Sequence, residues 1–367
     1  MRIAVAVTND LVTDQRVARA CQTLMAAGHS VTLIGRLLPD SMPICRPYAT
    51  HRMRLLFRKG PLFYAEYNIR LFFYLLTHGF DMAYANDTDT LMACYLGGRL
   101  RGMRVFYDAH EMFAEVPELV GRPLVRRMWE TIEGCIVPRV DGAVTVCQSI
   151  ADIYSRRFGI AFGVVRNVPD GYTAAAQVEK LVPPVILYQG AVNIGRGIDR
   201  LIDAMEYLPD YRFLVVGVGD EYESMRRYAA GKAWHERIEF RGRMEPAELR
   251  LLTPQASLGV CLLDNLGLNY YYSLPNRIGD FIAAGVPMLA TRFPEIARVV
   301  EGYGIGYLVD DESGAALAQR ISDAVTHWQS LSPEERDARM AAARADLSWN
   351  NDSRHLVAAV ERCFNKH

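Results

Sequence analysis

The sequence of 367 residues lacks the markers of several large classes of protein. No uninterrupted apolar stretch approaches the roughly 18 residues that a membrane-spanning helix needs. The apolar run at residues 1–10 is short, and neither a signal-peptide hydrophobic region nor a small-residue cleavage site follows it. We therefore expect this run to be the first core strand of a cytoplasmic protein.

Cysteine and net charge are also low. The seven cysteines are widely scattered, and none forms a CxxC pair or has a His at zinc-finger spacing, so we expect thiols in a reducing compartment. Lys and Arg number 41 against 42 Asp and Glu, and residues 1–170 carry 20 against 16. This mild asymmetry is compatible with an anionic surface as partner, but sequence-specific DNA binding needs a denser basic patch, and we expect no nucleic-acid partner.

A complete dinucleotide-binding GxGxxG motif is missing. The turn after residues 3–7 contains no glycine, and the second candidate has Gly217 and Gly219 but Tyr222 at the third position. An ordinary NAD-dependent enzyme is therefore disfavoured.

Short apolar runs instead alternate with helical patterns along almost the whole chain. We expect two series of strands, at residues 3–7, 30–34, 82–85, 103–107, 143–146 and 163–165, and then at 185–188, 212–216, 238–240, 258–261, 287–290 and 306–308. Such strands, separated by helices, are typical of parallel sheets covered on both faces. The sequence thus predicts an α/β fold of two doubly wound domains, with a linker at residues 169–184.

The second half carries dispersed elements that suit an anion. Gly190 ends a strand in a glycine turn, where backbone amides can approach a phosphate. Arg196 precedes a helix that starts near Ile198, and a cation beside a helix N-terminus suits a diphosphate. The alternative for Arg196 is a solvated loop arginine.

Residues 273–287 form the most informative segment. Pro275 starts a helix whose first-turn amides are free, with Arg277 beside them. One turn later, Asp280 is placed to accept hydrogen bonds from vicinal hydroxyls. Gly285 and Pro287 end the helix before the next strand.

This segment resembles the signature of family-4-like retaining glycosyltransferases of the GT-B fold. The resemblance extends along nearly the whole chain, through residues 14–17, 85–91, 107–111, 164–169 and Trp349. It implies two Rossmann-like domains facing a central cleft, with a C-terminal helix that crosses back to the N-domain. We expect an acceptor-side domain at 1–170, a nucleotide-sugar donor domain at 171–345 and the crossing helix at 346–367.

The family implies transfer of a sugar from a nucleotide diphosphate sugar to a glycan or lipid-linked acceptor, with retention of configuration and without a metal or other cofactor. By the same resemblance, the donor-binding residues are Gly190, Arg196, Asn276, Arg277 and Asp280. Gly190, Arg196 and Arg277 would hold the diphosphate, and Asp280 would hold the ribose.

The resemblance also assigns two catalytic residues, His110 near the transferred sugar and Asp87 facing the acceptor. His110 lies beside Asp108 and Glu111, which favours a functional role over a packing role. Asp87 and Asp89 form a DxD sequence that could chelate a cation. We favour the alternative, a helix N-cap, because a helical run follows directly.

One departure from the family concerns an acidic residue. Eight residues before Asp280 the family has a carboxylate that contacts donor-sugar hydroxyls, and this chain has Tyr272. The identity of the sugar and the strength of the activity therefore stay open. Two alternatives remain, a nucleotide-sugar epimerase of related fold and a non-catalytic sugar-nucleotide-binding subunit.

Residues 51–76 are basic and rich in aromatic side chains. Such a segment can settle at an anionic bilayer, with Arg122, Arg126, Arg127 and Trp129 extending the surface. This interpretation predicts a lipid-linked acceptor and peripheral attachment at the inner face of the cell membrane. The alternative is a domain helix whose aromatic residues pack in the core.

Overall fold

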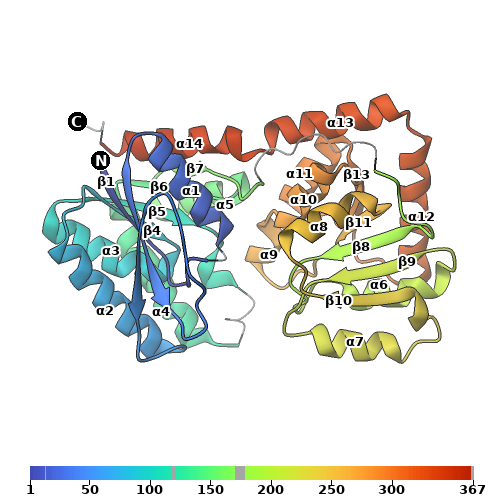
Figure 1. Cartoon of the computed structure of the whole chain (residues 1–367), viewed down its shortest axis with the longest axis horizontal. Coiled ribbons are helices and arrows are strands. Elements are labelled where there is room, and N and C mark those ends of the chain that lie inside the picture. Colours follow the sequence, from blue (N-terminus) through green and yellow to red (C-terminus); the bar gives the residue numbers. More distant parts are fainter. Residues whose placement is uncertain (13, 117–118, 120, 170–177, 365–367) are drawn as a thin grey trace. The chain divides into compact units, whose positions relative to one another are not determined.

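The computed structural model describes residues 1–12, 14–116, 119, 121–169 and 178–364 (Figure 1). Contacts divide the chain into two compact units, Met1–Asn167 with Asp352–His367, and Val168–Asn351. Half of the expected linker at 169–184, residues 170–177, lies outside the described residues. Two connections therefore join the units, after Asn167 and before Asp352.

The described part of the first unit contains one parallel sheet of seven strands, in the order β3-β2-β1-β4-β5-β6-β7. The strands are β1 (Arg2–Ala6), β2 (Ser30–Leu37), β3 (Ala49–Arg54), β4 (Met82–Asn86), β5 (Arg104–Ala109), β6 (Gly142–Thr145) and β7 (Phe162–Val164). The helices are α1 (Gln15–Ala26), α2 (Pro61–Thr77), α3 (Thr88–Arg101), α4 (Pro123–Ile136) and α5 (Gln148–Phe158). The strand order reverses between β1 and β4, and ligands of doubly wound sheets bind at the carboxyl ends of strands at such a reversal.

The second unit repeats the architecture with six described strands, in the order β10-β9-β8-β11-β12-β13. The strands are β8 (Val185–Gln189), β9 (Arg212–Val216), β10 (Ile238–Gly242), β11 (Leu258–Cys261), β12 (Met288–Thr291) and β13 (Gly306–Val309). The helices are α6 (Ile198–Ala204), α7 (Tyr222–Ala230), α8 (Pro246–Leu252), α9 (Leu268–Tyr272), α10 (Asn276–Ala284), α11 (Pro294–Tyr303), α12 (Gly314–Ser330) and α13 (Pro333–Asp346). The fold class predicted from the sequence is confirmed, because both units are parallel-sheet α/β structures.

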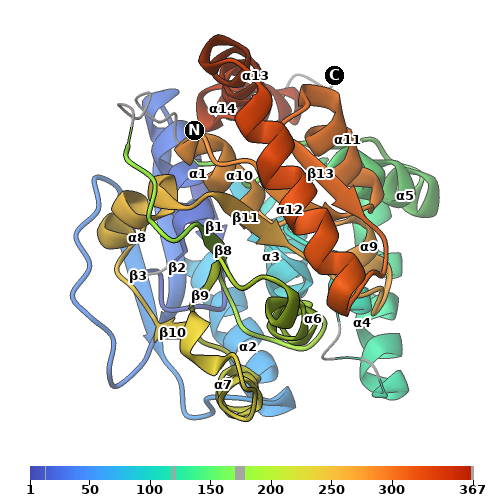
Figure 2. The ribbon, with the colours of Figure 1, turned by 90° about the vertical axis from the view of Figure 1, so that its right-hand side faces the viewer.

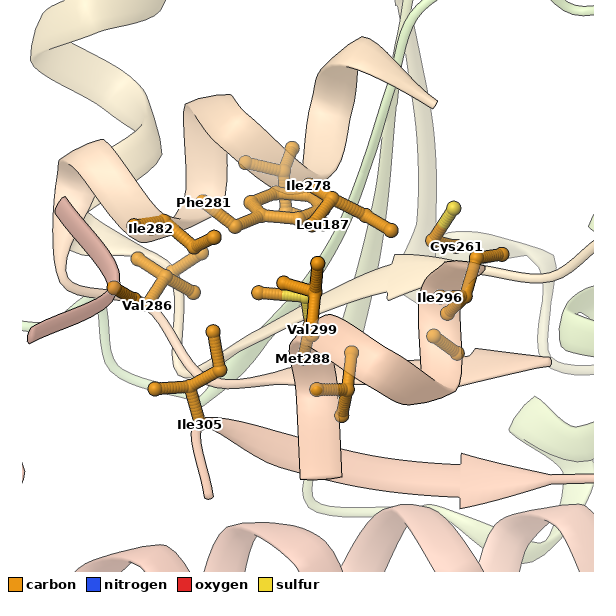
Figure 3. Packing of buried hydrophobic residues seen from close by; sticks show 14 of the residues in the cluster. Leu187, Cys261, Ile278, Phe281, Ile282, Val286, Met288, Ile296, Val299 and Ile305 are labelled. Carbon is orange, nitrogen blue, oxygen red and sulfur yellow. The ribbon is translucent and has the colours of Figure 1, made fainter. Parts of the chain in front are cut away.

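Each face of the second sheet is covered by its own apolar layer. One layer joins the strands to α6 and α12, which Figure 2 shows in front of the sheet. The other joins them to α10 and α11, with Phe281 of α10 in the middle of the cluster in Figure 3. A Cβ at Gly259 would lie 2.6 Å from the Phe281 ring, so the ring rests directly on the β11 backbone. This packing fixes α10, which also carries Arg277 and Asp280.

The last helix, α14 (Trp349–Arg362), belongs mainly to the first unit. Asp352 in its first turn is fully buried and accepts hydrogen bonds from the Arg166 backbone N–H at 2.7 Å and from its guanidinium Nη2 at 2.9 Å. At the far end, Cys363 lies against Gly142 of β6, where an added Cβ would be 2.5 Å from its sulfur. One ion pair and one close contact thus anchor the helix at both ends.

Candidate active site

Asp87 lies directly after β4, at the reversal of strand order in the first unit. Its backbone has φ 58° and ψ 171°, a conformation that costs a residue with a side chain about 1–3 kcal/mol. The helix N-cap interpretation is only partly right, because Asp87 occupies the cap position of α3 without a capping side-chain bond. Its Oδ1 instead accepts a hydrogen bond from the His110 backbone N–H at 2.8 Å. The Asp87 carboxylate therefore points from the carboxyl end of β4 to the loop after β5.

The His110 ring lies between two carboxylates. Its Nδ1 is 3.3 Å from Asp87 Oδ2, and its Nε2 is 3.5 Å from Asp108 Oδ2. Burial by itself lowers the pKa of His110, but the two carboxylates outweigh it and raise the pKa to about 9. Burial raises the pKa of Asp87 to about 7, with the Glu111 and Asp89 charges adding to it and His110 opposing it. The structure therefore brings the two predicted catalytic residues together and favours a cationic imidazole at neutral pH.

Asp108 is fixed by two further residues that sequence reasoning did not assign. Its Oδ1 accepts from Arg16 Nη2 of α1 at 2.7 Å, and its Oδ2 accepts from the Tyr84 hydroxyl of β4 at 2.6 Å. Burial by itself raises the pKa of Asp108, but the adjacent Arg16 guanidinium and the His110 ring hold it well below its usual range. The available signal was that Arg16 directly precedes Val17 on the apolar face of α1.

Asp89 points away from this group. Its Oδ2 accepts from the Thr8 hydroxyl at 2.5 Å, across the reversal between β1 and β4, and burial raises its pKa to about 6. Among the residues that the structure describes, no group of three His, Cys, Asp or Glu side chains is arranged to hold a metal. The absence of a metal from the reaction stays a prediction.

In the second unit, Gly190 follows β8 with φ 122°, and a Cβ there would be 3.4 Å from Arg277 Nη2. The neighbouring glycines have a structural role. A Cβ at Gly217 would be 1.8 Å from the Gly190 carbonyl oxygen, and one at Gly219 would be 2.4 Å from the Val192 carbonyl oxygen. The incomplete dinucleotide motif therefore lets the turn after β9 pack against the Gly190 loop.

Two arginines reach this loop while resting on tyrosine rings. The Arg277 guanidinium lies 4.3 Å above the ring of Tyr188, and that of Arg196 lies 4.5 Å above the ring of Tyr270. Arg277 is only 7% exposed, and its Nη1, like Arg196 Nε, is buried without a hydrogen-bond partner in the described structure. Since an unpaired buried cation is costly, both arginines suit an anionic ligand. Asn276, the first residue of α10, is exposed beside them.

Asp280 lies one turn beyond Arg277 and lines a pocket of about 320 Å³. Its Oδ2 accepts from Gln189 Nε2 at 3.0 Å, and Gln189 Oε1 in turn accepts from the Thr253 hydroxyl at 2.9 Å. Sequence reasoning missed both partners, although Gln189 ends the strand before Gly190. Tyr272 packs edge-on against the Tyr271 ring, with 4.9 Å between ring centroids.

The segment proposed for a membrane surface divides between the core and the solvent. Phe63 of α2 is buried, and Trp129 of α4 is also buried, against Tyr64 and Phe113. The expectation that Trp129 extends an exposed surface is therefore wrong, because edge-to-face ring contacts hold it inside. None of the helices in the described ranges has both the length and the apolarity that crossing a bilayer requires.

Comparison with known proteins gives matches over most of the chain. Residues 14–174 match the family described as Glycosyltransferase Family 4, and residues 183–327 match Glycosyl transferases group 1. A phosphatidyl-myo-inositol mannosyltransferase of Mycobacterium leprae is 30% identical over 141 residues, which are 37% of this chain and 36% of that protein.

Solved structures show the same fold over the full length. Sucrose-phosphate synthase from Thermosynechococcus elongatus matches with a TM-score of 0.78 and 18% identity, covering 100% of both chains. The Anabaena protein HepE in complex with UDP-glucose matches with a TM-score of 0.73 and 13% identity, covering 98% of this chain and 99% of that one. At these identities the likeness concerns the fold.

Proposed function

Because the chain is a family-4-like glycosyltransferase of the GT-B fold, we propose that it moves a sugar from a nucleotide diphosphate sugar to a glycan or lipid-linked acceptor, with retention of configuration. One observation carries the donor assignment. Arg196 and Arg277 reach the Gly190 loop without an acidic partner in the described ranges, and each has a buried nitrogen that a phosphate oxygen can satisfy.

The leaving group explains why this arrangement suits catalysis. A departing nucleotide diphosphate gains negative charge in the transition state, and cations already in position stabilise that charge. The tyrosine rings of Tyr188 and Tyr270 hold the two guanidinium groups, so little reorganisation is needed. In the proposal these arginines replace a metal, Asp280 binds the ribose, and the adjoining 320 Å³ pocket takes the base.

The first unit supplies the acceptor side. His110, held cationic between Asp87 and Asp108, places a positive charge beside the transferred sugar, and Asp87 faces the acceptor hydroxyl. With its pKa near 7, the Asp87 carboxylate is suited to accept a proton at neutral pH. The leaving phosphate is the other group that can take this proton on the same face.

Two findings guide the choice of substrates. HepE was solved with UDP-glucose, which makes UDP-sugars the first donors to test. The mannosyltransferase relative is named for a phosphatidyl lipid, which supports a lipid-linked acceptor. Leu56, Phe57 and Leu62, close to Arg58 in sequence, and Phe73 farther along α2 are exposed and available for peripheral contact with an anionic membrane.

The test is a thermal-shift panel of UDP, GDP, ADP and their sugar conjugates, with and without EDTA, followed by a transfer assay with the conjugate that binds. We expect one base to give a shift that EDTA does not change. Arg277→Gln should lose this shift, while Arg226→Gln, whose arginine pairs with Glu223 on the surface of α7, should keep it. No shift with any nucleotide would contradict the donor assignment. Tyr272 favours one alternative, the binding subunit, and binding without transfer to any acceptor would establish it. Conversion of the donor without an acceptor would indicate an epimerase.

A further inference from the structure

A pocket of about 420 Å³ lies in the first unit, at the carboxyl ends of β2 and β3. Three arginines line it, Arg36 near the end of β2, Arg54 at the end of β3, and Arg58 in the loop before α2. The Ser41 hydroxyl is the other polar side chain of the lining, which contains no Asp or Glu. Among the described residues, none of the three arginines forms an ion pair.

Two acidic side chains near this pocket, Asp10 and Glu66, already have partners. Asp10 accepts from Arg52 Nη1 at 3.3 Å and from the Ser41 hydroxyl at 2.7 Å. Glu66 accepts from the backbone N–H groups of Leu56 and Phe57 and pairs with Arg70 at 2.8 Å. The neighbouring Arg52 and Arg70 are therefore neutralised, whereas the positive charge at the pocket is left for a ligand.

Arg36 is held in place without being neutralised. Its Nη1 donates to the Arg58 carbonyl oxygen at 3.1 Å, and its guanidinium lies 4.8 Å above the ring of Phe63. Its Nε is buried and has no hydrogen-bond partner within the described ranges. Immediately after Arg58 and Lys59, the 17-residue helix α2 begins at an N-cap glycine, Gly60, that provides no side-chain cap. The positive end of that helix adds to the same field.

We propose that this pocket binds the phosphate or diphosphate group of the acceptor substrate. The inference deepens the proposed function and rests on it, since it adds a chemical class to the acceptor. Three guanidinium groups with unused donors are suited to phosphate oxygens. Exposed Leu56, Phe57 and Leu62 beside the pocket, at 81%, 43% and 58% exposure, provide a surface for a hydrocarbon chain.

The topology also sets how far the phosphate lies from the reacting hydroxyl. The pocket at β2 and β3 and the Asp87 carboxylate after β4 both lie at the carboxyl ends of the strands, two to three strand spacings apart. At the usual spacing of strands, this is about 10–15 Å. The acceptor therefore carries its phosphate at that distance from the hydroxyl that is glycosylated.

The experiment measures binding of inorganic diphosphate, farnesyl diphosphate and farnesol by calorimetry, using the full chain. The test variant is Arg54→Gln/Arg58→Gln, because both side chains are exposed and the change should not affect folding. Arg101→Gln/Arg156→Gln removes the same number of charges from exposed arginines in the last turns of α3 and α5, and it controls for net charge. Arg277→Gln separates this pocket from the donor site. We expect farnesyl diphosphate to bind at least about tenfold more weakly to Arg54→Gln/Arg58→Gln and unchanged to Arg101→Gln/Arg156→Gln and Arg277→Gln.

Each outcome decides the proposal. Equal losses in Arg54→Gln/Arg58→Gln and Arg101→Gln/Arg156→Gln would show an effect of bulk charge and would overturn the proposal. A loss confined to Arg277→Gln would place all diphosphate binding at the donor site and would also overturn it, as would binding of farnesol alone. Inorganic diphosphate binding as tightly as farnesyl diphosphate would identify a water-soluble phosphorylated acceptor, and much weaker binding a lipid-linked one. The nucleotide shift is measured separately on Arg54→Gln/Arg58→Gln, so a failure of the donor assignment is distinguishable from a failure of this pocket.

Discussion

The Arg16–Asp108 pair gives the sharpest quantitative prediction. Both side chains are almost fully buried, at 3% and 2% exposure, and they lie 2.7 Å apart. Asp108→Asn keeps the shape but leaves the Arg16 guanidinium buried without its counter-charge. Removing one partner of a buried pair costs about 3–5 kcal/mol, and we expect a loss of that size in the free energy of unfolding. Arg70→Gln, which removes a partly exposed ion pair in the same unit, should cost less than about 1 kcal/mol.

The measurement is urea denaturation of Asp108→Asn, Arg16→Met and the combined variant. Because the combined variant contains neither buried charge of the pair, it should be more stable than Asp108→Asn alone. The difference between wild type and Asp108→Asn also depends on pH. Since the folded pKa of Asp108 is held below the unfolded value of about 3.9, its contribution is complete above that pH and is lost as the pH falls through the folded pKa.

A second readout tests whether Asp108 acts through His110. Losing the Asp108 charge should lower the pKa of His110, as followed by NMR of the imidazole, whereas a purely structural role would leave that pKa unchanged. The reasoning is refuted if Asp108→Asn costs no more than Arg70→Gln, or if the combined variant is less stable than Asp108→Asn alone.

Three further predictions concern the donor site, the imidazole and the glycine contact. Arg277→Ala should weaken nucleotide binding by about 1–3 kcal/mol in calorimetry, and wild-type affinity would contradict the placement of the diphosphate. The pKa of His110 is raised from an ordinary 6.5 to about 9 in the folded protein, so the stability that its charge provides is complete below pH 6.5 and is lost as the pH rises through 9. We expect kcat/KM to fall as the pH rises through the same range. A pH profile of kcat/KM that stays flat to pH 10 would exclude a cationic role for His110. Gly217→Ala should lower the melting temperature, because the added Cβ would be 1.8 Å from the Gly190 carbonyl oxygen. Gly134→Ala, in the helix α4 with open space around it, should instead raise the free energy of unfolding by about 0.5–1 kcal/mol. Equal effects of the two substitutions would refute the close-contact argument.

The fold was largely predictable because its strands are buried on both faces. The apolar run at 185–188 is buried throughout, in the strand Val185–Gln189, and each of the twelve expected runs overlaps an observed strand. The sequence missed β3, which lies at the sheet edge, where only Met53 of its six residues is buried. A half-exposed edge strand has too few apolar residues to be separated from a polar loop. The capping box of Ser332 and Glu335, by contrast, is local and can be seen directly in the sequence.

The candidate site was less predictable, because its chemistry depends on contacts between distant segments. Parallel topology alone places Asp87 and His110 together at the carboxyl ends of the strands, since both residues directly follow strands. It does not specify that Arg16 bonds to Asp108, 92 residues away, and to the Val165 carbonyl oxygen, 149 residues away. Several carboxylates lie near His110 in sequence or at the carboxyl ends of the same strands, and side-chain geometry is needed to show that Asp87 and Asp108 flank the ring. The pairing of acids and bases, which sets the charge of the imidazole, therefore follows from three-dimensional packing rather than from spacing along the chain.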